Sequence, residues 1–173
     1  PSNCDRNKTP GIDMTTGSLG QGISAAIGVA LGYRMKKINN WIYLIIGDGE
    51  SQEGQIWEGA LFASHFKVDN LIAFLDHNKQ QIDGYVKDVM DLGDLHKKFE
   101  DFGWHVQTVD GHDVDAIDHA IRIAKKTTGK PSMIVLETEK GKGCSFAEGV
   151  LDNHHMHVTN DQIEESLKSL GCD

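Results

Sequence analysis

Helical and strand-like hydrophobic patterns alternate along most of the chain. From Gln21, apolar residues recur at the i, i+3, i+4, i+7, i+8 spacing of one buried helix face. This pattern ends near Lys36 and Lys37, whose positive charges suit a helix C-terminus. An uninterrupted apolar run over residues 41–46 follows and stops at Gly47-Asp48-Gly49. Such a run is typical of a parallel strand buried on both faces, so we expect this strand to be central in its sheet.

The same alternation continues through the rest of the chain. It predicts helices over residues 56–66, 92–102 and 114–126, strands over 71–76, 105–109 and 132–138, and a last helix over 161–170. Repeated βαβ units with right-handed crossovers give an α/β fold, a doubly wound parallel sheet with helices on both faces. Ligands of such folds bind outside the carboxyl ends of the strands, so the loops there are the candidate site.

Length and composition limit the class of protein. The chain has 173 residues, of which 39% are hydrophobic and 25% charged, so we expect one globular domain over residues 1–173. Its formal net charge of −9 repels a polyanion, which argues against nucleic acid as a partner. No apolar run approaches the roughly 20 residues of a membrane span, so we expect no membrane association.

The cysteines and the first residue give two further expectations. Three cysteines without a CxxC spacing indicate neither a disulfide framework nor a zinc site, which fits a reducing cytoplasm. The chain starts at Pro1 rather than at methionine, so we expect a fragment of a longer protein.

Two oxygen-bearing side chains follow neighbouring predicted strands. Asp48 lies between two glycines after the first strand, and Asn78 lies thirty positions later, after the next one. If the two strands are neighbours, about 4.8 Å apart, both side chains lie at one edge of the sheet and can share an ion. Oxygen ligands select a hard cation such as Mg²⁺, which completes its shell with water and phosphate. The spacing therefore favours a magnesium and diphosphate site.

A glycine loop at residues 17–22 opens the first helix, where free backbone N–H groups favour an anion. The loop also contains Gly20-x-Gly22-x-x-Ala25, a weak match to a dinucleotide fingerprint, but no apolar strand precedes it. We therefore prefer a phosphate cradle to a nicotinamide site. For each of these loops taken alone, turn glycines, helix caps or a solvated carboxylate are the alternative interpretation.

The stretch over residues 152–157 contains three histidines and an aspartate. Its composition could suggest zinc, but its spacing matches no common structural zinc motif, so a solvated loop is the favoured interpretation. Cys144 lies beside a glycine loop, and no sequence feature indicates an activated thiolate there. We interpret Cys144 as a small filler rather than a nucleophile.

Four segments of the chain resemble the thiamine diphosphate-binding domain of transketolases, in the same order: TTGSLGQG, GDGESQEGQIWEGALFASHFKVDNLIAFLDHNKQQIDG, VDGHD and KPSMIVLETEKGKG. The second segment is similar to the thiamine diphosphate signature, GDG followed about thirty residues later by Asn. The resemblance covers nearly the whole chain. It implies the thiamine diphosphate-binding fold and the later two thirds of the diphosphate domain, as in the short N-terminal subunits of split transketolases.

The resemblance also assigns cofactor and metal ligands. It implies that Asp48 and Asn78 bind Mg²⁺ through their side chains and Gln80 through its backbone carbonyl. It further implies that Gly17 and Gly49 contact the diphosphate or lie beside it and that Leu19 packs near the cofactor's rings. Gln80 stands where standard transketolases have isoleucine, a change that a backbone ligand tolerates.

Catalytic residues are implied in the same way. Glu53 and Glu58 match acidic positions that in the family lie at the subunit interface and link the two active sites. The alternative is one exposed helix face. The family's site histidine, which contacts diphosphate or substrate, matches His154 when counted forward from Ser145 and His155 when counted backward from Asp161. We assign the role to His154.

The implied function is that of a transketolase, which moves a two-carbon ketol unit from a ketose phosphate to an aldose phosphate in the pentose phosphate pathway. The cofactors are thiamine diphosphate and Mg²⁺. A C-terminal transketolase subunit with the pyrimidine domain completes the active site in a dimer or heterotetramer, so the isolated chain is incomplete. The alternatives are 1-deoxyxylulose-5-phosphate synthase, a keto-acid dehydrogenase component, or a non-catalytic assembly module that binds no cofactor.

Overall fold

The computed structural model describes residues 4–172, in which four parallel strands form one sheet with the order β1-β2-β6-β5. The strands are β1 (Ile42–Gly47), β2 (Leu71–His77), β6 (Ser132–Glu137) and β5 (His105–Asp110). Gly47 is paired with Asp76, and Asp76 with Leu136. Three adjacent strands therefore end at the same level, and the loops that follow them leave from one edge of the sheet.

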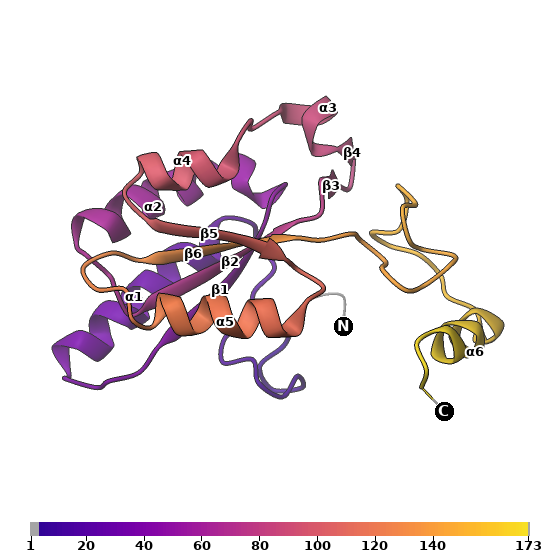
Figure 1. Cartoon of the computed structure of the whole chain (residues 1–173), viewed down its shortest axis with the longest axis horizontal. Coiled ribbons are helices and arrows are strands. Elements are labelled where there is room, and N and C mark those ends of the chain that lie inside the picture. Colours follow the sequence, from indigo (N-terminus) through magenta and orange to yellow (C-terminus); the bar gives the residue numbers. More distant parts are fainter. Residues whose placement is uncertain (1–3, 173) are drawn as a thin grey trace.

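Helices cover both faces of this sheet, as the sequence predicts. Figure 1 shows α2 (Gly54–His65) and α4 (Leu95–Asp101) on the side of the sheet opposite α5 (Val114–Ala124). The larger core joins α1 (Gln21–Met35), α2 and α4 to side chains of β1, β2 and β6. The smaller core packs Ala120 and Ala124 of α5 against Ile72 and Ile134.

Side-chain caps fix the starts of three helices. Asp113 accepts hydrogen bonds from the first-turn N–H groups of α5, and Thr159 forms a capping box with Gln162 at the start of α6 (Asn160–Ser169). The predicted helix over residues 92–102 begins only at Leu95, because the Asp94 side chain accepts from the Lys97 N–H at 2.9 Å. The other predicted helices and strands are confirmed, with shifts of one or two residues at their ends.

The expectation that the first strand is central is wrong for the described residues. β1 pairs only with β2 and lies at the sheet edge, and Tyr43 and Ile45 are 50% and 72% exposed. Their face of the sheet carries only α5 among the described helices, and α5 packs over β5 and β6 and against Ile72 of β2 rather than over β1. The apolar run therefore has one buried and one uncovered face, and β2 and β6 are the central strands.

Short elements around the first two strand ends were not predicted. β3 (Gln80–Gln81) and β4 (Gly84–Tyr85) form an antiparallel hairpin, which continues into α3 (Val86–Met90), and a 3₁₀ turn, η1 (Glu50–Gln52), follows β1. Elements of two to five residues are too short to show a hydrophobic period. The hairpin folds against the turn because Gln52 Nε2 donates to Gln81 Oε1 at 2.7 Å.

The C-terminal segment stands apart from the sheet in Figure 1. Ser169 Oγ donates to the carbonyl of Gly143 at 3.0 Å, and Ser145 Oγ donates to Glu165 at 2.8 Å. The predicted apolar stripe of α6 remains half exposed, with Leu167 at 46%. No helix of residues 4–172 has the length and hydropathy needed to cross a bilayer.

The contact between α1 and α2 depends on the absence of a side chain at Gly59. A Cβ there would lie 3.0 to 3.2 Å from three side-chain carbons of Ile23, whereas a Cβ at Gly28 of α1 would meet nothing within 4 Å. We predict that Gly59→Ala lowers the free energy of unfolding by about 1–3 kcal/mol through overpacking. Gly28→Ala should raise it by about 0.5–1 kcal/mol, because alanine loses less backbone entropy in a helix.

Urea denaturation of both variants and the parent chain measures the two effects. The same substitution is made in both cases, so helix propensity cancels in the comparison. Equal stability of Gly59→Ala and Gly28→Ala would show that the α1–α2 contact has room for a methyl group, contrary to the prediction.

Candidate functional site

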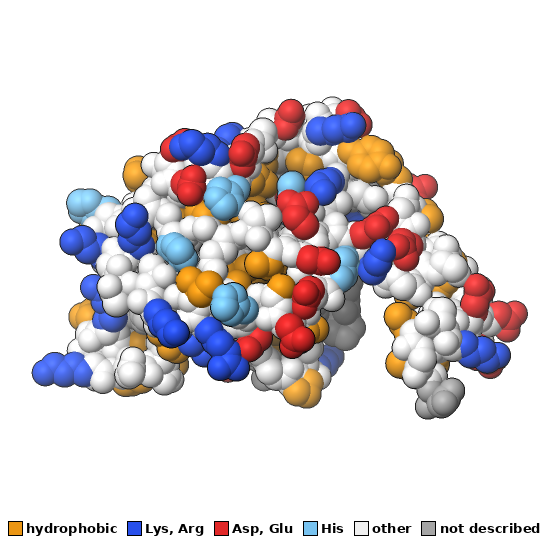
Figure 2. Space-filling model, in the orientation of Figure 1, with side chains coloured by type: hydrophobic (Ala, Val, Ile, Leu, Met, Phe, Trp, Pro, Cys, Tyr) orange, Lys and Arg blue, Asp and Glu red, His pale blue; other side chains and the backbone are white. Residues whose placement is uncertain are grey.

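The parallel register brings Asp48 and the loop after β2 together. Gly49 N–H donates to Asp48 Oδ1 at 2.7 Å, and Lys79 N–H donates to Asp48 Oδ2. The two predicted side chains, Asp48 and Asn78, thus belong to adjacent loops at one edge of the sheet. In Figure 2, acidic side chains form a column along the edge at which the strands end.

The amide of Asn78 is held in a defined orientation. Its Nδ2 donates to Asp76 Oδ2 at 2.9 Å, and its Oδ1 accepts from the Gln80 N–H at 2.9 Å. The other oxygen of Asp76 accepts from the Thr138 hydroxyl, which comes from the loop after β6. Asp76 therefore links the loops after β2 and β6, and it fixes which atom of the Asn78 amide is the oxygen.

Asp48 is a buried carboxylate without a cationic partner. It is only 2% exposed, and burial raises its pKa, against the hydrogen bonds from Lys79 and Gly49 and the charge of His77. Among the described residues, no side-chain nitrogen of Lys, Arg or His lies within 4.0 Å of its oxygens. Burying an unpaired carboxylate is unfavourable. A cation bound at this position would relieve that cost.

The donor set at this edge fits Mg²⁺. Asp48 supplies carboxylate oxygen, Asn78 an amide oxygen and Gln80 a backbone carbonyl, which are the hard ligands that Mg²⁺ prefers. No three His, Cys, Asp or Glu side chains of residues 4–172 converge as metal ligands. A metal held here by these residues would therefore use amide and carbonyl oxygens, together with oxygens of water or of a bound ligand.

Glu50 joins the glycine loop to the loop after β1. Its Oε1 accepts from the Gly20 N–H at 2.8 Å, and its Oε2 accepts from the Gly47 N–H at 3.1 Å. Gly20 has a φ of 77°, and a Cβ there would lie 3.0 Å from the Glu53 Cβ, so both the backbone and the space require glycine. Sequence reasoning missed Glu50, because a glutamate in a short turn has no pattern that reveals two backbone partners.

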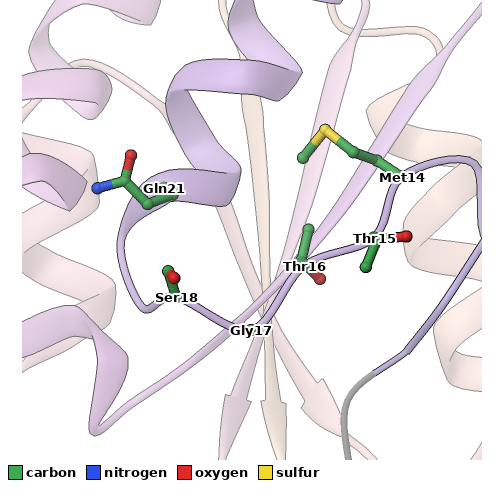
Figure 3. Close-up of a pocket in the computed structure, with 6 residues that line it drawn as sticks. All are labelled: Met14, Thr15, Thr16, Gly17, Ser18 and Gln21. Atoms are coloured by element: carbon green, nitrogen blue, oxygen red, sulfur yellow. The ribbon is translucent and has the colours of Figure 1, made fainter.

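Two cavities border this edge of the sheet. One, of about 510 Å³, is lined by the segment that enters α1: Met14, Thr15, Thr16, Gly17, Ser18 and Gln21 (Figure 3). The other, of about 390 Å³, lies between Asp48, the loop after β2 and the segment from β4 to α4. Gly17 thus lines a different cavity from Asp48. Leu19 is 57% exposed.

An ionic cluster centred on Glu137 lies near Asp48. Glu137 contacts His77 Nδ1 through one oxygen and Lys79 Nζ through the other, each at 2.8 Å. Burial raises the pKa of Glu137, but the hydrogen bonds from Lys79 and His77 outweigh it and lower the pKa. Glu137 ends β6 and its partners follow β2, so this cluster also ties two strand ends together.

The two candidate histidines differ in their contacts. Lys140 Nζ donates to His154 Nδ1 at 3.0 Å, whereas the His155 ring packs edge-on against the His154 ring at 5.3 Å. Burial lowers the pKa of Lys140. The charges of Asp76 and Asp48 act in the opposite direction, so these two carboxylates lie close enough to influence Lys140. Lys140 therefore connects His154, rather than His155, to the Asp48 region. Sequence reasoning did not single out Lys140.

Glu53 and Glu58 are both exposed and lie near the start of α2. Glu53 precedes the helix as its N-cap residue without a side-chain cap bond, and its Cβ lies next to Gly20. Their assignment to a subunit interface stays a prediction, because an exposed helix face has the same appearance in a single chain.

Comparisons with known proteins show the family to which the chain belongs. A family model described as the transketolase thiamine diphosphate binding domain matches residues 1–173. The chain is 55% identical over 170 residues to the 6-deoxy-6-sulfo-D-fructose transketolase subunit SqwG of Clostridium sp. (strain MSTE9), covering 98% of this chain and 62% of the relative. It is 37% identical over 163 residues to an apulose-4-phosphate transketolase subunit of Phocaeicola vulgatus, covering 94% and 58%. The chain thus spans less than two thirds of these curated relatives.

Solved structures show the same similarity. The fold matches transketolase from Campylobacter jejuni with a TM-score of 0.87 and 32% identity, over 94% of this chain and 27% of that chain. It matches a Pichia stipitis transketolase complex with sedoheptulose-7-phosphate with a TM-score of 0.86 and 34% identity, over 95% and 26%.

The role of Glu50 leads to a stability prediction. Glu50→Gln keeps one acceptor oxygen but turns an amide NH₂ toward one of the two backbone N–H groups, so that N–H loses its partner. We expect the free energy of unfolding to fall by about 1–3 kcal/mol. Glu53→Gln is the matched control, because the Glu53 side chain is exposed and forms no cap bond, and it should change stability by less than about 0.5 kcal/mol. Equal denaturation midpoints for the two variants would contradict the bridging role.

Proposed function

The chain belongs to the transketolase family and carries the family's thiamine diphosphate-binding domain, and on this premise we propose that it anchors thiamine diphosphate and Mg²⁺ in a two-subunit transketolase. The observation that carries the proposal is the buried Asp48 carboxylate, which has no cationic side-chain partner among the described residues. It accepts from the N–H of Lys79, the residue that follows Asn78 and its oriented amide. A buried anion at the carboxyl edge of a parallel sheet suits a cation that accompanies a diphosphate.

The proposed metal ligands are the side chains of Asp48 and Asn78 and the backbone carbonyl of Gln80. Gly49 and Gly17 offer backbone to the diphosphate, and Leu19 offers an exposed apolar side chain to the cofactor's rings. A Cβ at Gly49 would lie 3.0 Å from the Gln81 Cβ, so this position has no room for a side chain. Glycine at this position therefore lets the β3–β4 hairpin pack against the turn after β1, beside the proposed ligands.

Thiamine diphosphate, when bound, supplies the carbon nucleophile and the electron sink that ketol transfer requires. The residues of this chain hold and orient it. Asp48 and Asn78 fix the metal, His154 offers a ring N–H to an oxygen, and Glu53 and Glu58 link this site to a neighbouring subunit.

The proposed partner is a C-terminal transketolase subunit that carries the pyrimidine domain, in a dimer or heterotetramer. In the family, the glutamate that activates the cofactor's aminopyrimidine comes from that domain. The relatives from Clostridium and Phocaeicola vulgatus are themselves named as transketolase subunits. Exposed Glu53 and Glu58 on this chain are available for such a contact.

The proposed substrate class is a ketose with an anionic group at its far end. The relative at 55% identity is named for 6-deoxy-6-sulfo-D-fructose, and the one at 37% for apulose-4-phosphate. We take the sulfonated sugar as the first candidate donor, with a sugar phosphate as the second. A role in the pentose phosphate pathway and a cytoplasmic location stay predictions.

The other functions considered have less support. The relatives from Clostridium and Phocaeicola vulgatus are named as transketolase subunits, which favours a transketolase over a 1-deoxyxylulose-5-phosphate synthase or a keto-acid dehydrogenase component. A non-catalytic assembly module has no need for a buried carboxylate next to an oriented amide. The juxtaposition of Asp48 and Asn78 therefore favours a cofactor-binding chain over a module that binds none.

Cofactor binding is the first test of this proposal. Calorimetric titration of thiamine diphosphate into the chain should give heat in the presence of Mg²⁺ and none with a chelator. Asp48→Ala should weaken binding by more than about 10-fold, because it removes a metal ligand. Asp115→Ala on α5 makes the same substitution at an exposed aspartate and should bind as the parent does. Parent-like binding by Asp48→Ala, or no binding by the folded chain with its partner subunit, would refute the proposed site.

Donor choice can be measured once the partner subunit is added. We expect the assembled enzyme to use 6-deoxy-6-sulfo-D-fructose with a kcat/KM at least about 10-fold above that for fructose 6-phosphate. The two donors share one sugar and differ in the anion, since a sulfonate has one negative charge and a phosphate monoester between one and two at neutral pH. A higher kcat/KM for the phosphate would assign the chain to sugar phosphates instead.

A further inference from the structure

Lys140 has no role among the proposed ligands, yet its side chain contacts His154. Lys140 lies in the loop after β6, and its Nζ is 3.0 Å from His154 Nδ1, fourteen residues later in the chain. Asn153 holds the backbones of this loop together, because its Nδ2 donates to the carbonyls of Lys140 at 3.3 Å and Ala147 at 2.8 Å. The residue before His154 is thus tied to Lys140 itself, so the contact between the two side chains is supported by the fold of the loop.

The chemistry of the two groups decides which atom donates. A lysine ammonium has three N–H donors and no acceptor, so His154 Nδ1 must accept. In a neutral imidazole one ring nitrogen accepts and the other carries the proton. The single proton of His154 is therefore on Nε2, and that N–H is free to face a ligand.

The surroundings keep each group in the required charge state. Burial lowers the pKa of Lys140, and the carboxylates of Asp76 and Asp48 act against this effect and favour the ammonium. Burial, followed by the charges of Lys140 and His155, lowers the pKa of His154 and favours its neutral form. An ammonium donor and a neutral imidazole acceptor are therefore the mutually compatible states.

We propose that Lys140 is a positioning residue that holds neutral His154 in the tautomer protonated at Nε2, so that His154 serves as a hydrogen-bond donor to an oxygen of the bound cofactor or sugar. The tautomer part depends only on this chain. The ligand part rests on the proposed function. Without Lys140, both ring nitrogens of His154 compete for the proton, and part of the population presents an acceptor where a donor is needed.

Lys142 provides a matched control on the same loop. Its Nζ contacts Glu148 Oε1 at 2.8 Å, and its side chain and that of Glu148 are 51% and 33% exposed. Lys142→Met therefore removes the same charge two residues away without touching His154. Lys140→Arg retains a cationic donor and serves as the rescue variant.

Nitrogen-15 NMR of the histidine rings in the ligand-free chain tests the tautomer. His154→Gln and His155→Gln spectra assign the signals. The parent should show His154 protonated at Nε2 alone at a pH above its pKa. Lys140→Met should give a mixture of both tautomers and an upward shift of the His154 pKa, because a neighbouring positive charge is lost. Lys140→Arg should keep the parent pattern, and Lys142→Met should not change it.

The proposal fails if the parent shows His154 protonated at Nδ1. This test uses the parent chain, so it does not depend on whether a variant folds. It also fails if Lys140→Met leaves both the tautomer and the pKa unchanged. Addition of thiamine diphosphate and Mg²⁺ then tests the donor role: a shift of the Nε2–H signal upon binding supports it, and binding without a shift refutes it. Absence of binding, with the parent tautomer pattern intact, would refute the proposed function and leave the Lys140–His154 pair standing.

Discussion

The site depends on the register of three parallel strands. Pairing of Gly47 with Asp76, and of Asp76 with Leu136, brings the ends of β1, β2 and β6 to one level, so Asp48, Asn78 and the loop that carries Lys140 leave the sheet together. A shift of one residue in any strand would turn its buried side chains to the opposite face of the sheet. The apolar residues of both cores therefore fix the strand register on which the site's geometry depends.

The charges at this edge are arranged around a carboxylate that the protein leaves unpaired. Glu137 has two cationic neighbours, whereas buried Asp48 has backbone N–H donors and no ionic partner within salt-bridge distance among the described residues. Removing a carboxylate from water without a counter-charge lowers stability, so Asp48 weakens the folded state on its own. Glu50 and Asp76 offset part of that cost, since their hydrogen bonds tie the surrounding loops to one another.

Hydrophobic periodicity was sufficient to predict most of the fold, because α1, α2 and α5 each bury one regular stripe. The edge position of β1 was not predictable, since an apolar run does not reveal whether its second face is covered. Among site residues, Asp48 and Asn78 could be found because each follows a strand in the sequence. Glu50 and Lys140 could not, because their partners are backbone N–H groups, one of them thirty residues away, and a histidine in a separate segment.

Some site residues could be predicted from the sequence and others could not, and the reason lies in which atoms build the site. Much of it is backbone: the Gly49 and Lys79 N–H groups hold Asp48, and the Gln80 N–H holds Asn78. Backbone groups are the same for every residue type, so contacts to them cannot be recognised from the sequence. The exception is glycine, at positions such as Gly20 and Gly49 where a Cβ would collide with a neighbour. A residue that contributes only its backbone to a site can change its side chain without changing that contact, as the Gln80 N–H contact to Asn78 illustrates. Lys140 differs in this respect: its effect on His154 requires a cationic donor, so that contact, unlike the backbone frame, depends on the identity of one side chain.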